Sequence, residues 1–391
     1  MKYNFDEVVD RKGTYSCKLD QMPEGAPSDA LSVWVADMDF ACAEPIIRAL
    51  HERIDRKIFG YTIYDNEDLK HAVTGWFRRR YGWEVAKEDV FFSPGVVPAL
   101  AFLLQALTSE GDGIIIQRPV YYPFTNKING NNRKIFNSSL IYENGDYRMD
   151  YEDLEKKFAD EAVKGMILCS PHNPVGRVFT AEELRRLGEI CLENDVFVIA
   201  DEIHSDLVYS GHKHIPFASI SKEFEQNTIS FMNPSKTFNL AGLQSSTIVF
   251  NDEAKKDAYV AELKRMDIAR NNCFSLVATM EAYAHGEQWL DELLVYLGDN
   301  MRFIRSFCAE RLPELKPNTP EATYLNWVDA RALGMDDAAL KKFCVEKAGV
   351  AFGEGTVFGI GGSGFLRLNA ACPRSVIEKA LTQMEQAVRS R

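Results

Sequence analysis

The sequence has little of what marks a membrane or an exported protein. No window approaches the ~20 consecutive apolar residues that a membrane-spanning helix needs. The first ten residues, MKYNFDEVVD, also lack the apolar stretch of a signal peptide. We therefore expect a chain that is neither inserted into a membrane nor exported, and we expect it in the cytoplasm.

Basic residues are the minority among the charged ones. Lys and Arg number 45 against 57 Asp and Glu, which gives a formal net charge of −12. This balance does not attract a nucleic-acid backbone or an anionic membrane surface, so we expect neither as a partner. The eight cysteines show no paired spacing and no CxxC motif, which indicates reduced thiols, several of them buried.

The remaining composition is that of a globular protein, and 391 residues are too many for a single small core. Short apolar runs predict strands at 90–93, 114–117, 134–136, 165–170, 196–200, 228–231 and 246–250. Helical patterns, such as 97–107 and 181–194, lie between several of them. The runs lack strict alternation, which is typical of strands buried on both faces. The pattern predicts an α/β sheet covered by helices on both sides.

After residue 252 the pattern changes to long amphipathic helices, predicted at 252–268 and 287–312. Strands near 323–328 and 364–368 follow, and then a last helix with Pro373 in its first turn. We predict an N-terminal segment, 1–45, that joins a small C-terminal domain, 286–391. A large domain, 46–285, lies between them.

A strand end turns into a helix at residues 93–100, SPGVVPAL. Gly95 permits a tight turn, and the amides of Val96 and Val97 then lie at a helix N-terminus, where phosphate binds readily. Many strand-to-helix turns contain glycine, so packing alone is the stronger interpretation of this turn taken by itself.

Two more polar groups follow buried strands. Asn173 lies in the loop SPHNPVGR at 170–177, where two prolines and a glycine fix the backbone. A rigid turn in which Asn173 binds its own backbone explains this loop equally well. Asp201 comes directly after five apolar residues and needs a cationic or hydrogen-bonded partner there. A protonated pyridine nitrogen and an arginine from elsewhere both meet that need.

Lys236 lies in NPSKTFNLAG, residues 233–242, directly after the strand predicted at 228–231. Small polar and then apolar neighbours would desolvate its amine, and desolvation lowers a lysine pKa. Such a lysine can form a Schiff base and can act as a general base. A solvated surface position is the default for any lysine, but these neighbours do not fit it.

The order and spacing of these features say more than any one of them. The set includes Tyr121, in RPVYYPF at 118–124, and Arg367, in GFLRLN at 364–369. Together it resembles the fold-type I pyridoxal-phosphate enzymes, the aspartate aminotransferase superfamily, over nearly the whole chain. The resemblance implies a large domain with a mixed, mostly parallel sheet and a smaller α/β C-terminal domain.

The resemblance also implies roles around pyridoxal 5′-phosphate. Lys236 would hold the cofactor covalently, and Asp201 would keep its pyridine nitrogen protonated. Tyr121 would stack on the ring, and Asn173 would bind the ring's phenolic oxygen near the substrate carboxylate. The phosphate would be bound by Gly95, Val96, Val97 and Ser235.

Two further roles concern the substrate and the assembly. Arg367 would bind the substrate α-carboxylate with two parallel hydrogen bonds, a geometry that lysine cannot supply. Tyr61, in FGYTIY at 59–64, matches a tyrosine that reaches the phosphate of the neighbouring subunit. We therefore expect a homodimer with shared active sites.

Several segments are similar to one subgroup, the MalY/PatB-type carbon–sulfur β-lyases, which are cystathionine β-lyase-like. They are VWVADMDF at 33–40, GVVPAL at 95–100, DEIH at 201–204, PSKTFNLAG at 234–242, FLRLN at 365–369 and CPRS at 372–375. His204, a further cofactor-binding candidate, stands where typical aminotransferases have tyrosine. The arginine that aminotransferases tend to carry beyond the lysine is missing at 244–247, QSST. Leu19 and Asn233 depart from the subgroup's pattern.

The subgroup implies β-elimination with Lys236 as the base, on L-cystathionine or a related amino-acid thioether. The products would be pyruvate, ammonia and a thiol. One alternative is a class I/II aminotransferase of aromatic or other amino acids, against which His204 argues. Another is a non-catalytic regulatory protein on the same fold. For HKH at 212–214 we predict a surface turn and no metal site, because no acidic or cysteine ligand has useful spacing.

Overall fold

The computed structural model describes residues 2–63, 66–143, 145–268 and 270–391. Its largest element is a seven-stranded sheet in the order β2-β10-β9-β8-β7-β3-β4. β10 runs antiparallel to both neighbours, and the other pairs are parallel. The strands are β2 (Val90–Ser93), β3 (Gly113–Ile116), β4 (Lys134–Asn137), β7 (Val163–Cys169), β8 (Phe197–Asp201), β9 (Thr228–Phe231) and β10 (Ser246–Phe250). The predicted mixed, mostly parallel sheet is confirmed.

Both faces of this sheet are covered, because alternate residues of each strand point to opposite sides. In β8, Ile199 packs into one core and Val198 into another. The first core takes side chains from α4 (Val96–Leu107), α5 (Pro123–Gly130) and α10 (Glu253–Arg265). The second takes them from α6 (Tyr151–Phe158), α7 (Ala181–Glu193) and α8 (Lys222–Asn227). This double burial explains the uninterrupted apolar runs.

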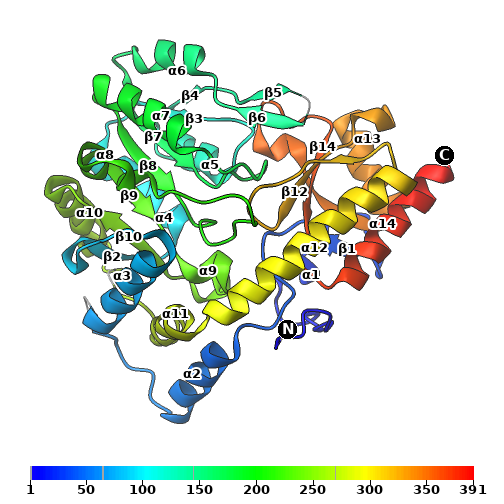
Figure 1. Ribbon diagram of the computed structural model, residues 1–391, viewed down its shortest axis with the longest axis horizontal. Coiled ribbons are helices and arrows are strands. Elements are labelled where there is room, and N and C mark those ends of the chain that lie inside the picture. The colour runs from blue at the N-terminus through cyan, green and yellow to red at the C-terminus, as the bar shows by residue number, and fades with distance from the viewer. Residues whose placement is uncertain (1, 64–65, 144, 269) are drawn as a thin grey trace.

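A second sheet has the order β1-β13-β14-β12-β11. Its strands are β1 (Leu31–Val33), β11 (Lys316–Pro317), β12 (Leu325–Asp329), β13 (Val350–Glu354) and β14 (Phe365–Asn369). β1 pairs in parallel with β13, so the N-terminal segment contributes a strand to the sheet of the C-terminal part. Figure 1 shows this smaller unit beside the large sheet.

The long helix α12 (Glu287–Arg311) joins the two units (Figure 1). Its first half, including Trp289 and Leu293, packs into a core with residues of α3 (Glu67–Tyr81) and α11 (Cys273–His285). Its second half, including Ile304, packs with α14 (Arg374–Arg389) and the second sheet. We propose the division 1–45, 46–285 and 286–391 for the chain, with α12 in contact with both sides of its last boundary.

The remaining α-helices and strands are short or peripheral. They are α1 (Cys17–Asp20), α2 (Glu44–Asp55), α9 (Pro234–Thr237), α13 (Asp337–Lys342) and the hairpin strands β5 (Ile141–Glu143) and β6 (Asp146–Arg148). Observed bounds lie within about three residues of the predicted ones, the usual scatter of element ends. Pro373 was expected inside the last helix, but it precedes α14 with an extended backbone, φ −51° and ψ 142°. None of the helices in the described part of the chain is long and apolar enough to cross a bilayer.

Candidate functional site

The polar groups named from the sequence follow strands that lie side by side. In the register of the large sheet, Asp201 at the end of β8 is opposite Cys169 of β7 and Phe231 of β9. The loop with Asn173 therefore leaves the sheet beside Asp201, and the helix α9 with Lys236 leaves it on the other side. This edge, at the carboxyl ends of parallel strands, is where α/β sheets bind ligands.

Asp201 is a buried carboxylate, 3% exposed. Its hydrogen-bond donor within the described chain is the amide of Ile203, at 3.4 Å from Oδ1. Burial raises the pKa of Asp201 to about 7, while the nearby Lys236 amine acts in the opposite direction. A carboxylate in this setting needs a proton or a cation against it. A protonated pyridine nitrogen fits that requirement.

Lys236 lies on the short helix α9, whose N-cap Asn233 accepts a hydrogen bond from the Ser235 amide. Its Nζ donates to the carbonyl oxygen of Ala36 at 2.8 Å. Burial and the charge of Arg367 lower the pKa of Lys236 to about 8, with Asp37 and Asp201 opposing. An amine with this pKa is partly uncharged near neutral pH, as a nucleophile or base must be.

A buried carboxylate fixes the helix that presents Lys236. Thr237 donates its hydroxyl to Oδ2 of Asp206 at 2.8 Å, and the Trp76 indole nitrogen donates to Oδ1 at 3.1 Å. Tyr81 also donates to Asp206. Asp206 is thus bound to three donors from α3 and α9, and α9 is fixed against the large unit one residue beyond Lys236.

Arg367 belongs to β14 of the second sheet and is 6% exposed. Its Nη1 donates to Oδ1 of Asn173 at 3.2 Å, and its Nη2 donates to the Trp34 carbonyl at 2.8 Å. Burial lowers the pKa of Arg367 to about 10. Its Nε is buried without a hydrogen-bond partner among the described residues. The acceptors of this guanidinium are neutral, and its Nε–H is left for a ligand. Such a guanidinium is suited to binding a ligand carboxylate.

The turn expected to bind phosphate lies at the same edge, since β10 pairs Ser246 with Ser93 of β2. Gly95 is the N-cap of α4 with φ of +142°, a conformation that a residue with Cβ adopts only under strain. Val96 and Val97 form the first turn, whose amides have no acceptor within their own helix. These amides can bind an anion.

Tyr121 and His204 lie close to the same charges. Burial raises the pKa of Tyr121 to about 12, and both Asp201 and Arg367 act on it. Burial, Lys236 and Arg367 lower the pKa of His204 to about 3, so its imidazole is uncharged. The His204 ring packs edge-on against Tyr324 at 5.8 Å, and its Nδ1 has no hydrogen-bond partner in the described chain.

Tyr61 stands apart from this cluster. It is 95% exposed, and its contact is with Arg270, whose guanidinium lies 5.2 Å from the ring centre. The single chain therefore brings together Lys236, Asp201, Asn173 and Arg367, with Tyr121 and His204 beside them, but not Tyr61. No hydrogen bond of the described residues joins Ser235 to the Gly95 turn.

Sequence reasoning missed the segment Trp34–Met38, called the strap below. Its five carbonyl oxygens accept hydrogen bonds from side chains of both units. Arg367 donates to the Trp34 carbonyl, and Asn369 donates to those of Val35 and Asp37. Both Lys236 and Tyr324 donate to the Ala36 carbonyl. The Met38 carbonyl accepts from Asn239 and Arg11. The motif at 33–40 was noted as a resemblance, but main-chain acceptors leave no mark on residue type.

Four charged side chains of the N-terminal segment hold the strap in place. Arg11 binds Asp37 and Asp39 at 2.6 Å each, and the Lys18 Nζ lies 2.7 Å from Oδ2 of Asp39. Lys18 is fully buried. The charges balance as two cations and two anions, which is how a buried ammonium becomes tolerable.

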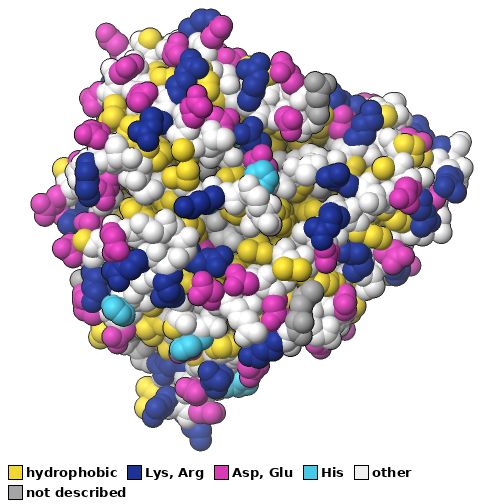
Figure 2. All heavy atoms as spheres, in the orientation of Figure 1, with side chains coloured by type: hydrophobic (Ala, Val, Ile, Leu, Met, Phe, Trp, Pro, Cys, Tyr) yellow, Lys and Arg dark blue, Asp and Glu magenta, His cyan; other side chains and the backbone are white. Residues whose placement is uncertain are grey.

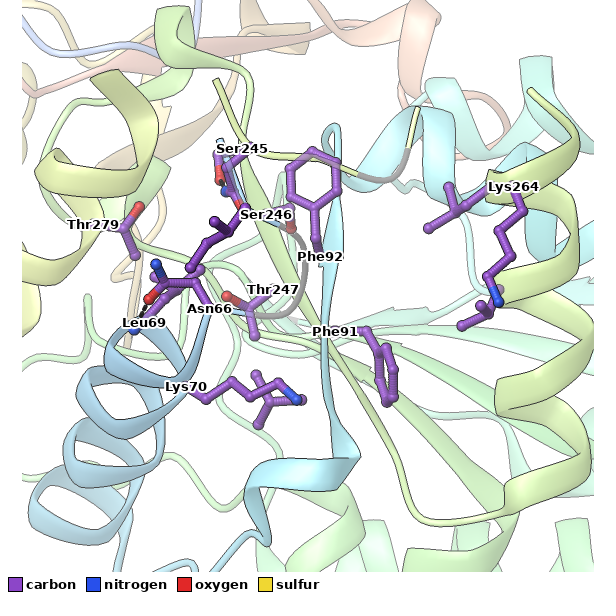
Figure 3. A pocket seen from close by; sticks show the side chains of 15 residues that line it. Asn66, Leu69, Lys70, Phe91, Phe92, Ser245, Ser246, Thr247, Lys264 and Thr279 are labelled. Atoms are coloured by element: carbon purple, nitrogen blue, oxygen red, sulfur yellow. Dashed lines mark hydrogen bonds between the residues drawn. The ribbon is translucent and has the colours of Figure 1, made fainter. Parts of the chain in front are cut away.

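A large cavity lies away from this cluster. It measures about 550 Å³ and lies between α3, β2 and α10, with Lys70, Phe91 and Ser246 among its walls (Figure 3). None of the predicted site residues lines it. This cavity is therefore separate from the cluster of groups with shifted pKa values at the strand ends.

The predicted surface turn at 212–214 is confirmed for the exposed His212 and Lys213 but is wrong for His214. His214 is 3% exposed, and its Nε2 lies 3.3 Å from Oε1 of the fully buried Glu202. The neighbouring Gly211 and Pro216 do not keep His214 at the surface, because its side chain packs beside Glu202, the residue after β8. Within the described residues no group of three metal-ligating side chains is found.

Comparison with known proteins gives a consistent result. The sequence profile "Aminotransferase class I and II" matches residues 33–384. The chain belongs to this family. It is 45% identical to cystathionine beta-lyase PatB of Bacillus subtilis over 386 residues, covering 98% of this chain and 100% of that protein. The resemblance to the MalY/PatB-type proteins is thus confirmed.

Solved structures of the family support the same fold. Cystalysin from Treponema denticola, which contains a pyridoxal 5′-phosphate cofactor, is 36% identical with a TM-score of 0.96, and the match covers 100% of both chains. A PLP-bound C-S lyase from Staphylococcus hominis is 36% identical with a TM-score of 0.93, over 99% of this chain and 98% of that one. The predicted fold-type I architecture is confirmed.

Proposed function

We propose that this chain is a pyridoxal-phosphate-dependent carbon–sulfur β-lyase that acts on L-cystathionine or a related cysteine S-conjugate. The observation that carries the proposal is the pairing of a lysine of lowered pKa with a buried arginine that has no carboxylate partner among its bonded groups. A base and a carboxylate-binding group are thereby placed around one position. The family members named above, a cystathionine β-lyase and two PLP-containing proteins, support the reaction type and the cofactor.

The residues present fit the cofactor. Asp201 would bind the pyridine nitrogen, Lys236 would be the covalent anchor, Tyr121 the stacking ring, and the turn Gly95–Val97 the phosphate. Ser235, Asn173 and His204 complete the proposed set. When bound, pyridoxal phosphate supplies an electron sink for the charge that develops at the substrate α-carbon.

Side chains and main-chain groups of the chain then have separate roles in the reaction. Arg367 binds the α-carboxylate, and Asn173 orients the guanidinium through its Oδ1. The neutral Nζ of Lys236 takes the α-proton, and the Cβ–S bond breaks with its electron pair going to sulfur. The new N–H bond of Lys236 can point to Ala36, whose carbonyl lies 2.8 Å from Nζ. The electron pair of the former Cα–H bond forms the Cα=Cβ double bond, and the departing sulfur takes up a proton and leaves as the thiol. Hydrolysis of the remaining three-carbon fragment gives pyruvate and ammonia.

The test is release of pyruvate from L-cystathionine, L-cystine and bulkier S-conjugates by the purified protein. We expect pyruvate from the wild type and none above background from Lys236→Ala. Lys222→Ala serves as the matched control, because its side chain is 87% exposed and its ion pair is with Glu225, outside the proposed site. Wild-type protein that converts its cofactor to the pyridoxamine form without pyruvate would instead be an aminotransferase.

We further propose a homodimer in which Tyr61 reaches the cofactor phosphate of the partner subunit. The exposed ring of Tyr61 supports this, as do the exposed apolar side chains on either side of it, Ile58, Phe59 and Ile63. An apolar stretch open to water is a usual mark of a protein interface.

On the face drawn in Figure 2, acidic and basic side chains are interspersed rather than gathered by sign.

A further inference from the structure

One oxygen atom accepts hydrogen bonds from the proposed base and from a tyrosine. The Ala36 carbonyl lies 2.8 Å from Nζ of Lys236 and 2.9 Å from the Tyr324 hydroxyl. Tyr324 precedes β12 and is 1% exposed. Its single hydroxyl proton is directed at Ala36, so the two donors converge on the same acceptor from different units of the protein.

The residues before and after Ala36 are fixed by hydrogen bonds to their carbonyl oxygens. Asn369 donates to the carbonyls of Val35 and Asp37 at 2.6 Å each, and Arg367 binds Trp34. With its neighbours fixed in this way, Ala36 cannot turn its oxygen toward one donor without losing several other bonds. Tyr324 is itself fixed by the edge-on contact of its ring with His204.

We propose that Tyr324 is a positioning residue which, together with the Ala36 carbonyl, holds the Lys236 amine beside the substrate α-carbon and favours its uncharged form. The inference rests on the proposed function and adds a residue to it. Two donors on one carbonyl compete for the same electron density, so each bond is weaker than it would be alone. An ammonium depends on a strong acceptor more than a neutral amine does, because its hydrogen bonds are charge-assisted.

Other groups act on Lys236 and Tyr324 and must stay unchanged in a test. The charged and titratable groups facing them come from β14, the strap, the end of β8 and the loops after β3 and β8. They are Arg367, Asp37, Asp201, Tyr121 and His204. Tyr324→Phe removes one hydroxyl and leaves all of these in place.

The first measurement uses the cofactor-free full chain and follows imine formation by absorbance after addition of pyridoxal phosphate, as a function of pH. Only the neutral amine reacts, so the rate should rise with a midpoint near 8 in the wild type. In Tyr324→Phe we expect the midpoint about 0.5 to 1 pH unit higher, which is the effect of one neutral hydrogen bond. At neutral pH the rate should fall about 3- to 10-fold.

The second measurement is the pH dependence of pyruvate formation. The acid limb of kcat should move in the same direction, while KM changes little because the bonds of Arg367 are untouched. Tyr209→Phe is the matched control. The Tyr209 hydroxyl donates to the carbonyl of Thr323, the residue before Tyr324, at 2.6 Å and has no hydrogen bond to the strap.

Three results would overturn the inference: an unchanged midpoint in Tyr324→Phe, an equal shift in Tyr209→Phe, or a loss of kcat that is the same at every pH. A wild type that forms the imine with the expected midpoint but releases no pyruvate would instead refute the β-lyase function. In that case the shift in imine formation still reports on Tyr324, so the two failures are distinguishable.

Discussion

At the residue scale, Asp201 links the proposed chemistry to stability. Burial raises its pKa from 3.8 to about 7, so the folded chain disfavours the charged carboxylate. For an acid whose folded pKa lies above the unfolded value, the contribution to stability is complete below about pH 4 and is lost as the pH rises to about 7. A shift of this size corresponds to at most about 4 kcal/mol.

We therefore expect Asp201→Asn to raise the melting temperature of the cofactor-free protein at about pH 8 and to change it little at about pH 4. With pyridoxal phosphate bound, the order should reverse, because the wild-type carboxylate then gains the pyridinium partner that asparagine lacks. Calorimetric scans of both proteins, with and without cofactor, check this. Identical melting at pH 8 without cofactor would show that Asp201 carries no burial penalty.

The single residues of the site differ in how well they could be foreseen. Lys236, Asp201 and Asn173 each follow a buried strand, and the carboxyl ends of such strands share one edge. Their proximity therefore followed from order along the chain. Ala36 and Tyr324 could not be found in this way, because one acts through its main chain and the other is an ordinary buried aromatic in sequence.

At the scale of elements, the strap is the part that sequence patterns left undescribed. Strands and helices were predictable from apolar runs and helical periodicity, and the structure adds a capping box of Thr180 and Glu183 at the start of α7. The strap has no regular structure, and its ion pairs join residues 11, 18, 37 and 39 without any periodic spacing. His214 was wrongly placed at the surface for a related reason: no sequence spacing indicates its contact with the buried Glu202.

Lys18→Met tests the ion cluster of the strap. The change keeps most of the apolar part of the side chain but removes the ammonium, and Asp39 then loses one of its two cations. We expect the free energy of unfolding to fall by about 3 kcal/mol, as for other broken buried pairs. KM for the amino acid should rise about tenfold, because Arg367 loses its fixed acceptor at Trp34 when the strap loosens.

Denaturant unfolding and steady-state kinetics of Lys18→Met measure the two effects. Lys12→Met is the control: this lysine is exposed and its Nζ approaches only the Ser28 carbonyl, at 3.5 Å, among the described residues. A stability loss without any change in KM would restrict the cluster to a folding role.

At the scale of the whole molecule, the proposed dimer makes a quantitative prediction. If Tyr61 reaches the partner's site, each active site takes Lys236 from one subunit and Tyr61 from the other. Tyr61→Ala and Lys236→Ala then remove groups that different subunits contribute to the same site. Each homodimer should then have little or no activity. Hybrids from a 1:1 mixture carry one site with both defects and one with neither, so the mixture should regain about one quarter of wild-type activity.

Mixing after dissociation and refolding, followed by a pyruvate assay, checks this expectation. A mixture with no more activity than the better homodimer would show that each site is built from one chain. Lys222→Ala mixed with Lys236→Ala controls for exchange, because it should give about one half of wild-type activity whichever way the sites are shared.

The strap also has a consequence for how the chain can be divided. Residues 24 and 25, between α1 and β1, are exposed and lie outside regular structure, whereas Arg11 and Lys18 on one side bind Asp37 and Asp39 on the other. A chain cut there would yield a short peptide that carries the two cations of the ion cluster, Arg11 and Lys18, and a large fragment that carries Asp37 and Asp39. Adding the peptide back should restore activity in a saturable, salt-sensitive way, so the residues before the cut should act in trans.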